Sequence, residues 1–271
     1  MAGVHDEGDI RGHHGHARAR SPAAPGGERV KLAISGTYSS GKTTTSIALS
    51  RLTGIPRTHA KTMREILPVL LPGRRLEDCS IPELLQLGMV RYAERAVHES
   101  HLPDGFISDG SSLHEWVYGK TRVAVGLHPG TRQDGDGFQS AAERTFFEQV
   151  IDAMGAVMRR HALQTYDAFV HLPIEFPLAA DGHRPVSEEF RVKSDHLLLD
   201  TLRQAGIAVH IVGGSLPDRL EAIVRTFGLA TVMPVGQAID LARAEIDRLD
   251  TSDEMTRQHV TAAAVAPKGR V

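Results

Sequence analysis

Four short apolar runs divide the chain, at residues 30–35, 106–108, 166–172 and 207–212. Each run has the length of a β-strand, and continuous apolar character is typical of strands that are covered on both faces of a parallel sheet. A weaker run at residues 55–60 predicts one more, brief strand that turns directly into a helix. The runs therefore predict the strands of a buried sheet.

Apolar positions with helical spacing fill the segments between these runs. One long pattern covers residues 80–101, and Ser80, Pro82 and Glu83 supply the cap, the early proline and the third-position glutamate that are typical of a helix N-terminus. Further helices are predicted at residues 43–52, 61–67, 139–164, 218–227 and 235–249, with another that ends at Gln204.

Alternating strands and helices predict a three-layer α/β domain with a parallel sheet, from about residue 29 to about residue 250. In the helix at 139–164, the broad apolar stripe from Phe146 to Met158 predicts a face that packs in the core. Residues 1–28 and 251–271 lack apolar periodicity, so we predict a disordered leader and a disordered tail.

One motif carries specific chemistry. Residues 36–43 read Gly-Thr-Tyr-Ser-Ser-Gly-Lys-Thr and fit the pattern G-x-x-x-x-G-K-[ST] of a phosphate-binding loop, between a predicted strand and a predicted helix as the motif requires. Backbone N–H groups and the helix N-terminus would face nucleotide phosphates, Lys42 would add a mobile charge, and the Thr43 hydroxyl would reach Mg²⁺. The predicted nucleotide-binding residues are Gly36, Ser39, Ser40, Gly41, Lys42, Thr43 and Thr44.

Two polar side chains follow predicted strands at the edge where ligands bind in parallel sheets. Asp109 ends the run at 106–108, and a carboxylate in that place is what a second Mg²⁺ contact requires. His59 lies near the end of the brief strand, where a site role and an ordinary surface histidine are both open. Thr43 and Asp109 are therefore the predicted metal ligands.

Composition narrows the classes of partner. The formal net charge of -2 gives no electrostatic case for nucleic acid or an anionic membrane, and no apolar run approaches the ~20 residues that span a bilayer. The single cysteine, Cys79, rules out an internal disulfide framework and fits a reducing cytoplasm. We expect a soluble cytoplasmic protein with a small-molecule partner, and we leave a homodimer open.

In their order, the motifs resemble the P-loop kinases grouped with the nicotinamide riboside kinase domain of the bacterial bifunctional NAD-biosynthesis regulator, a branch close to nucleoside and nucleotide kinases. The resemblance covers most of residues 29–228 and rests first on the phosphate loop and on the strand that ends at Asp109. The other motifs that carry it are Tyr166-Asp167, Leu172-Pro173, Asp181-Gly182-x-Arg184, Phe190-Arg191, Gly213-Gly214 and Asp218-Arg219. The resemblance implies a three-layer P-loop NTPase fold with a parallel sheet and a helical lid, similar to nucleoside and nucleotide kinases.

The resemblance also implies phosphoryl transfer from ATP, with Mg²⁺, to a small hydroxyl-bearing molecule. Carried onto this sequence, it makes Arg184 and Arg191 the cationic lid candidates, which would neutralise charge on the transferring group. Structural salt bridges are the alternative for both arginines. The loop from Gly213 to Arg219 corresponds to the family's segment that cradles the adenine, mostly through backbone contacts.

The sequence departs from that family on the acceptor side. Relatives usually carry a glutamate near the end of the second strand, where Arg57-Thr58-His59 stands here, and an arginine after the third-strand aspartate, where Gly110 stands. These departures leave the general base open between His59 and Asp109. The catalytic candidates are Lys42, His59, Asp109, Arg184 and Arg191.

Three functions fit the sequence. The leading one is an ATP-dependent kinase acting on a nucleoside-like or specialised metabolite. A nucleoside monophosphate kinase would need a basic pocket, for which the candidates are Arg57, Arg64, Arg91 and Arg95. The third is a nucleotide-binding regulatory switch; the guanine-specifying N-K-x-D motif is absent from the sequence, which favours ATP. The glycine-rich loop at 126–138 is open between a lid and a plain connection.

Overall fold

A computed structural model describes residues 30–130, 135–178 and 187–248. The predicted tails lie outside the described residues, as do Asp181 and Arg184, so the domain limits at 29 and 250 stay a prediction. The elements in chain order are β1 Lys31–Ser35, α1 Lys42–Thr53, β2 Arg57–His59, α2 Met63–Leu70, the short 3-10 helix η1 Leu76–Asp78, α3 Ile81–Ser100, β3 Phe106–Asp109, α4 Leu113–Val125, α5 Ala141–Thr165, β4 Ala168–His171, α6 Glu188–Gln204, β5 Val209–Ile211 and α7 Leu216–Phe227. A further helix spans residues 235–248.

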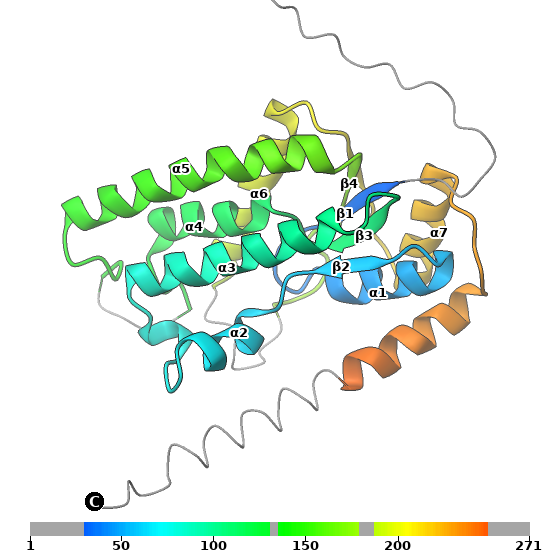
Figure 1. The fold of residues 1–271 in the computed structure, drawn as a ribbon, viewed down its shortest axis with the longest axis horizontal. Coiled ribbons are helices and arrows are strands. Elements are labelled where there is room, and N and C mark those ends of the chain that lie inside the picture. The colour runs from blue at the N-terminus through cyan, green and yellow to red at the C-terminus, as the bar shows by residue number, and fades with distance from the viewer. Residues whose placement is uncertain (1–29, 131–134, 179–186, 249–271) are drawn as a thin grey trace, which may run out of the picture.

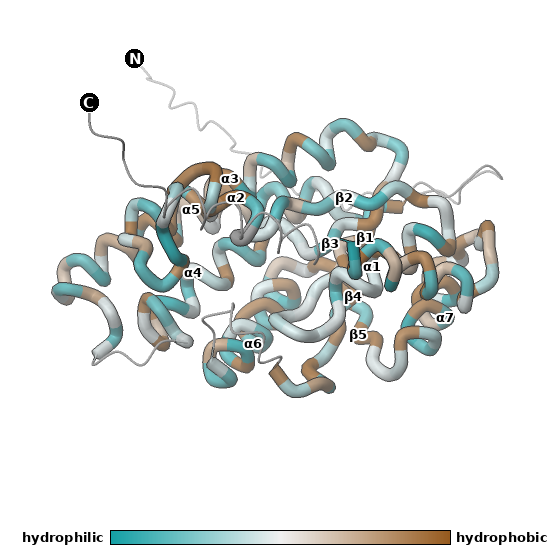
Figure 2. The backbone as a smooth tube through the Cα atoms, turned by 90° about the horizontal axis from the view of Figure 1, so that it is seen from below, coloured by the Kyte–Doolittle hydropathy of each residue, from teal (hydrophilic) through white to brown (hydrophobic). Residues whose placement is uncertain are grey.

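The five strands form one parallel sheet in the order β2-β3-β1-β4-β5 (Figures 1 and 2). In the register, Ile34 of β1 lies opposite Asp109 of β3, and Ser35 lies opposite His171 of β4. Because the strands are parallel, their carboxyl ends share one edge of the sheet, and the loops that follow β1, β3 and β4 meet there. The predicted parallel α/β architecture is confirmed.

Alternate residues of β1 enter two different cores. Leu32 and Ile34 pack with residues of α1, α7 and the helix at 235–248, whereas Ala33 packs with residues of α3, α4, α5 and α6. This division follows from strand geometry, because successive side chains point to opposite faces of a sheet. The sheet is thus the middle layer, with α1 and α7 on one side and α4, α5 and α6 on the other (Figure 2).

Helix ends follow the signals in the sequence. At the start of α3, the Glu83 carboxylate accepts a hydrogen bond from the Ser80 N–H at 2.7 Å, as the predicted cap requires. At the end of α1, Gly54 adopts φ 73° and its N–H donates to the Ser50 carbonyl oxygen. No helix among the described residues is both long and apolar enough to cross a membrane.

The apolar stripe of α5 is wider than the surface that the helix buries. Phe147, Ile151 and Met158 are buried, but Phe146 is 59% exposed and Val157 is 54% exposed. Successive helical residues are turned by about 100°, so neighbours such as Phe146 and Phe147 do not share one direction. The prediction that the whole stripe packs in the core is therefore wrong for Phe146 and Val157.

Candidate functional site

The phosphate-loop motif lies between β1 and α1, and its backbone favours glycine at both ends. Gly36 has φ 134° and Gly41 has φ 88°. A Cβ at Gly36 would lie 2.6 Å from the Leu172 carbonyl oxygen and 2.6 Å from Ser40 Oγ, so no side chain fits there. Ser39 also has a positive φ, 58°. Such a tight bend is typical of loops whose successive N–H groups face an anion.

Lys42 is the first residue of α1, and its side chain folds back over the loop. Its Nζ donates to the Thr37 carbonyl oxygen at 2.5 Å, and Ser40 Oγ donates to the same oxygen at 3.0 Å. Thr43 is exposed in the first turn of the helix, and Thr44 is half-buried. A glycine cradle, an ammonium group and an exposed hydroxyl at a helix N-terminus fit a nucleotide phosphate with its Mg²⁺.

His114, in the first turn of α4, supports the start of the loop. The Ser111 N–H donates to His114 Nδ1 at 3.0 Å, so the imidazole proton is on Nε2, which donates to the Gly36 carbonyl oxygen at 3.0 Å. Burial lowers the pKa of His114 well below its usual value, and the charges of Lys42 and Arg95 lower it further. A neutral imidazole therefore holds the first glycine of the motif in place.

Asp109 ends β3, next to β1, and its carboxylate has a cationic partner. Arg57 Nη1 lies 3.4 Å from Asp109 Oδ2, while Arg57 Nη2 lies 3.4 Å from Glu245 Oε1 on the helix at 235–248. The side chains of Arg57 and Asp109 are each 13% exposed. A carboxylate oxygen is a ligand that Mg²⁺ prefers, so the donor at this position suits the predicted metal role.

His59 lies opposite Asp109 in the register of β2 and β3, so the two candidate bases share one edge of the sheet. The ring is half-buried, and burial followed by the Arg57 charge lowers the pKa of His59, although Asp109 acts in the opposite direction. An imidazole with a lowered pKa is neutral at pH 7 and can accept a proton. Both candidates remain open as the base.

Three aromatic rings from three separate segments meet beside the phosphate loop. Tyr38 of the loop stacks on Tyr118 of α4, with ring centroids 4.9 Å apart. Phe190 of α6 lies 5.8 Å from the Tyr118 ring and 6.1 Å from the Tyr38 ring. Both tyrosines are half-buried and Phe190 is fully buried, so the tyrosines form the accessible part of this aromatic group.

A buried ion pair borders these rings. Arg91 Nε of α3 lies 3.0 Å from Glu115 Oε1 of α4, with side chains 17% and 3% exposed. Burial alone would lower the pKa of Arg91, but Glu115, Tyr38 and Tyr118 outweigh it and raise that pKa. We call these five residues the acceptor-side cluster: Tyr38, Arg91, Glu115, Tyr118 and Phe190. It combines flat rings with one strong donor and one strong acceptor.

Arg191 lies at the start of α6 and makes contacts near its own position. Its Nε and Nη2 lie 3.1 and 2.8 Å from Glu188 Oε1, and its Nη1 donates to the Phe176 carbonyl oxygen at 2.9 Å. These contacts tie α6 to the loop after β4. They match the alternative of a structural salt bridge, so the lid role of Arg191 stays a prediction. The other lid candidate, Arg184, lies outside the described residues.

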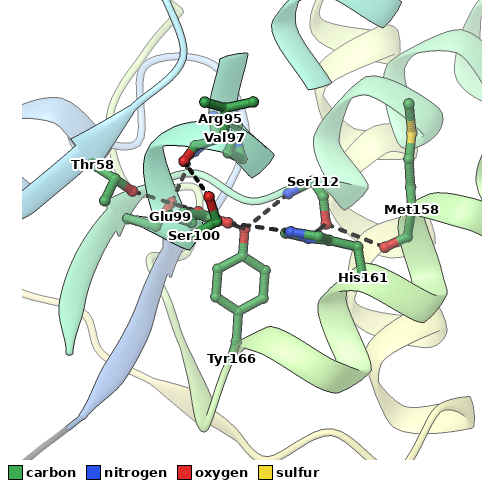
Figure 3. Close-up of polar contacts among 10 residues, drawn as sticks. Thr58, Arg95, Val97, Glu99, Ser100, Ser112, Met158, His161 and Tyr166 are labelled. Carbon is green, nitrogen blue, oxygen red and sulfur yellow. Dashed lines mark hydrogen bonds and ion pairs between the residues drawn. The ribbon is translucent and has the colours of Figure 1, made fainter. Parts of the chain in front are cut away.

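A buried polar network joins α3 to the end of β3 and to the start of α4 (Figure 3). Glu99 Oε1 accepts from Ser108 Oγ at 2.7 Å and from the Tyr166 hydroxyl at 2.9 Å, and Arg95 Nη1 donates to Ser108 Oγ at 2.8 Å. The Tyr166 hydroxyl accepts from the Ser112 N–H at 3.2 Å. Burial, together with Glu99, raises the pKa of Tyr166, which keeps its hydroxyl protonated as a donor. The network fixes the turn that follows Asp109.

Three of the four arginines considered for a phosphate-acceptor pocket have partners of their own. Arg57 and Arg91 pair with carboxylates, and Arg95 donates to a hydroxyl. The side chain of Arg64 is not among those described. These separate pairings give no support to the monophosphate kinase interpretation.

Sequence reasoning missed the acceptor-side cluster as a unit. Tyr38 stands at a position where the loop motif accepts any residue, so the motif gives it no weight. Tyr118 follows His114 by one helical turn, and this spacing was a usable signal that both side chains lie on one face of α4. Phe190 comes from a distant helix, and no local pattern places it beside Tyr38.

The amino-acid sequence matches the AAA domain family over residues 31–219. The chain belongs to this family. The match runs from β1 into α7, so the phosphate loop, Asp109 and the acceptor-side cluster all fall inside the AAA domain. No curated protein matches the chain.

The solved structures that are similar to this chain include a kinase. Deoxyadenosine kinase from M. mycoides, with products dCMP and dCDP bound, has a TM-score of 0.50 and 14% identity, and the match covers 73% of this chain and 99% of that one. The NadR protein in complex with NAD and AMP-PNP has a TM-score of 0.47 and 15% identity, covering 76% of this chain and 52% of NadR, so the chain spans about half of that protein. The first likeness confirms the predicted fold, that of P-loop nucleoside kinases.

Proposed function

We propose that this AAA domain protein is an ATP-dependent kinase that transfers a phosphoryl group to a hydroxyl of a nucleoside-like or specialised small molecule. One observation carries the proposal: a tightly bent loop with the phosphate-binding motif lies at the same sheet edge as Asp109 and beside the acceptor-side cluster. The family resemblance of the motifs supports the nicotinamide riboside kinase-like branch. A cytoplasmic location and a homodimer stay predictions.

On the nucleotide side, residues 36–44 would hold the phosphates through backbone N–H groups, and Lys42 would neutralise charge on the outer phosphates. Thr43 and Asp109 would hold Mg²⁺, which supplies charge neutralisation between the outer phosphates. Arg184 and Arg191 are the proposed cations beside the transferring group.

On the acceptor side, the hydroxyl oxygen would form a bond to the γ-phosphorus while the bond from that phosphorus to the β–γ bridging oxygen breaks. The hydroxyl proton would pass to His59 or to Asp109, and ADP leaves with the bridging oxygen. Because phosphoryl transfer has a loose transition state, the base needs little strength and positioning dominates.

The acceptor-side cluster supports a flat, polar acceptor. Tyr38 and Tyr118 offer aromatic surface, on which a heteroaromatic ring gains contact. Arg91 donates hydrogen bonds and Glu115 accepts them, so the pair suits a ring edge or a carboxamide that carries both a donor and an acceptor. A nucleoside-like acceptor meets both conditions, whereas a simple sugar meets only the second.

The test is ATP consumption by the purified chain across a library of nucleosides, sugars and hydroxylated metabolites, with mass detection of an acceptor that has gained one phosphoryl group. Lys42→Ala should lower the rate by about 10²–10³-fold, because one preorganised charge at the reacting phosphates is lost. Lys61→Ala, at an exposed ion pair with Glu94, is the matched control and should keep the wild-type rate.

A phosphorylated product that depends on Lys42 would establish the kinase and name its substrate. ATP binding with only slow hydrolysis, and with no acceptor in a broad library, would instead favour the regulatory switch.

A further inference from the structure

Arg219, in the first turn of α7, contacts the phosphate loop. Its Nη1 donates to the Ser40 carbonyl oxygen at 2.8 Å. The residue is 2% exposed, so the guanidinium is fixed inside the protein. A Cβ at Gly41 would lie 3.0 Å from the same nitrogen, which means that the guanidinium also lies against the second glycine of the motif.

The other side of the guanidinium is held by Glu175, in the loop after β4. Arg219 Nη2 donates to Glu175 Oε2 at 2.7 Å. The Gly214 N–H, in the loop after β5, donates to the two carboxylate oxygens at 2.9 and 3.0 Å. We call Ser40, Glu175, Gly214 and Arg219 the Arg219 clamp. It joins the three loops that follow β1, β4 and β5.

Gly213 leaves the space that the clamp needs. A Cβ at this position would lie 2.4 Å from Glu175 Oε1, so the carboxylate would have to move away from its present place. Gly213 thus accommodates the carboxylate by having no side chain, and Gly214 binds it through its N–H. The glycine pair serves Glu175 in addition to any contact with a nucleotide base.

The contact at Ser40 sets the direction of the peptide group that links Ser40 to Gly41. In a trans peptide the C=O and the following N–H point in opposite directions, and none of the peptide bonds in the described residues is cis. Arg219 holds the Ser40 C=O on the α7 side, so the Gly41 N–H points away from the guanidinium.

We propose that Arg219 is a positioning residue that preorganises the Gly41 N–H for nucleotide phosphates, and that Glu175 holds the guanidinium in position for this task. The inference rests on the proposed function in one respect, because it requires a nucleotide bound through its phosphates. A fixed donor needs no reorganisation when the anion arrives, which is the source of the gain in affinity.

Calorimetric titration of the full chain with MgATP, MgADP and adenosine separates this role from a general scaffold role. In Arg219→Gln we expect MgATP and MgADP to bind about tenfold more weakly, while the affinity for adenosine changes by less than about twofold. Arg225→Gln, an exposed position on the same helix, is the matched control and should bind all three ligands as the wild type does. Thermal unfolding without ligand checks that each variant folds.

Two further variants leave Arg219 in place and test the clamp even if Arg219→Gln does not fold. Glu175→Ala removes the carboxylate, and Gly213→Ala places a methyl group where that carboxylate lies. Both variants should lower the affinity for MgATP more than the affinity for adenosine, which is also the result expected for Arg219→Gln. Gly236→Ala, where a Cβ would meet nothing within 4 Å, should leave the ratio unchanged.

Equal losses for MgATP and adenosine in these variants, or no loss for either ligand, would overturn the positioning role. Wild-type protein that binds MgATP but phosphorylates no acceptor would contradict the proposed kinase and leave the clamp standing. Wild-type protein that binds no nucleotide would overturn both.

Discussion

Asp109 shares Arg57 with Glu245, so the carboxylate at the end of β3 already has a cation within 3.4 Å. A metal held at this position would compete with the guanidinium for Asp109 Oδ2, so the full negative charge of Asp109 would matter for the outcome. This residue-scale competition makes the dependence of turnover on Mg²⁺ concentration the informative measurement.

Asp109→Asn keeps the shape of the side chain and removes its charge. We expect turnover at a fixed Mg²⁺ concentration to fall by about a hundredfold or more, with saturation shifted to higher Mg²⁺. Asp240→Asn, at an exposed pair on the helix at 235–248, is the control. A variant with the wild-type rate and the wild-type Mg²⁺ dependence would remove Asp109 from the metal site.

His114 gives the protein a defined response to acid. Its pKa is lowered in the folded protein, so the unfolded chain binds the proton first as the pH falls below 6.5. The free energy of unfolding therefore decreases below that pH, by at most about 1.4 kcal/mol per pH unit for this single group.

His114→Gln removes this titration, and its amide group retains a donor for the Gly36 carbonyl oxygen. Between about pH 7.5 and about pH 5.5, urea unfolding should show a smaller loss of stability for the variant than for the wild type. His59, His128 and His161 also have lowered pKa values, but both proteins contain them, so their contribution cancels. An equal loss of unfolding free energy in the variant and the wild type would show that folding does not change the pKa of His114.

At the scale of elements, α4 and α5 approach closely because each has a glycine in the contact. A Cβ at Gly155 of α5 would lie 2.2 Å from Trp116 Cδ1, and a Cβ at Gly119 of α4 would lie 2.5 Å from Ile151 Cδ1. Both separations lie far inside van der Waals contact. The terminal methyl group of Ile151 could shift, whereas the rigid Trp116 ring leaves no room for a side chain at position 155.

Gly155→Ala should lower the free energy of unfolding by about 1–3 kcal/mol, because the new methyl group overpacks against Trp116. Gly88→Ala provides the matched control in α3, where a Cβ would meet nothing within 4 Å. That change should raise stability by up to about 1 kcal/mol, since alanine restricts the unfolded chain and favours helix. Chemical denaturation of both variants measures these changes. The free energy of unfolding must fall in Gly155→Ala and rise in Gly88→Ala.

The elements themselves were predictable because their signals are local. The apolar runs located all five strands, and the cap at Ser80 located the start of α3 to within one residue. The α5 stripe shows where local signals fail. Phe146 and Val157 carry the same apolar signal as Phe147, yet only the packing of α4 and α3 decides which side of the helix is covered.

Across the whole molecule, Tyr166 connects parts of the chain that lie far apart in sequence. Its hydroxyl donates to Glu99 of α3 and accepts from the N–H of Ser112 at the start of α4. Tyr166→Phe leaves both groups buried without this partner and should cost about 1–3 kcal/mol of stability. Tyr92→Phe, on α3 beside the His161 ring, is the control and should change stability by less than about 0.5 kcal/mol. Similar losses for both variants in thermal and urea unfolding would contradict the network.

The candidate site was predictable only where a motif encodes it. The phosphate loop and Asp109 follow from residue patterns next to strands, and both lie at the sheet edge as expected. The contacts of Arg219 with Ser40, and of Arg57 with Glu245, join residues with no sequence relation. Such pairs form only in the folded structure, so no periodicity or spacing in the sequence predicts them.

The residues of the Arg219 clamp leave the ribosome at different times during translation. The ribosome delivers residues 36–43 before Arg219, which emerges only after β4, α6 and β5 have been made. A nascent chain that has already folded β1 and α1 thus carries the complete loop motif without the contact that orients it. If Arg219 has the proposed role, the chain would hold a nucleotide tightly only after α7 has been made, although the loop motif leaves the ribosome before β4, α6 and β5.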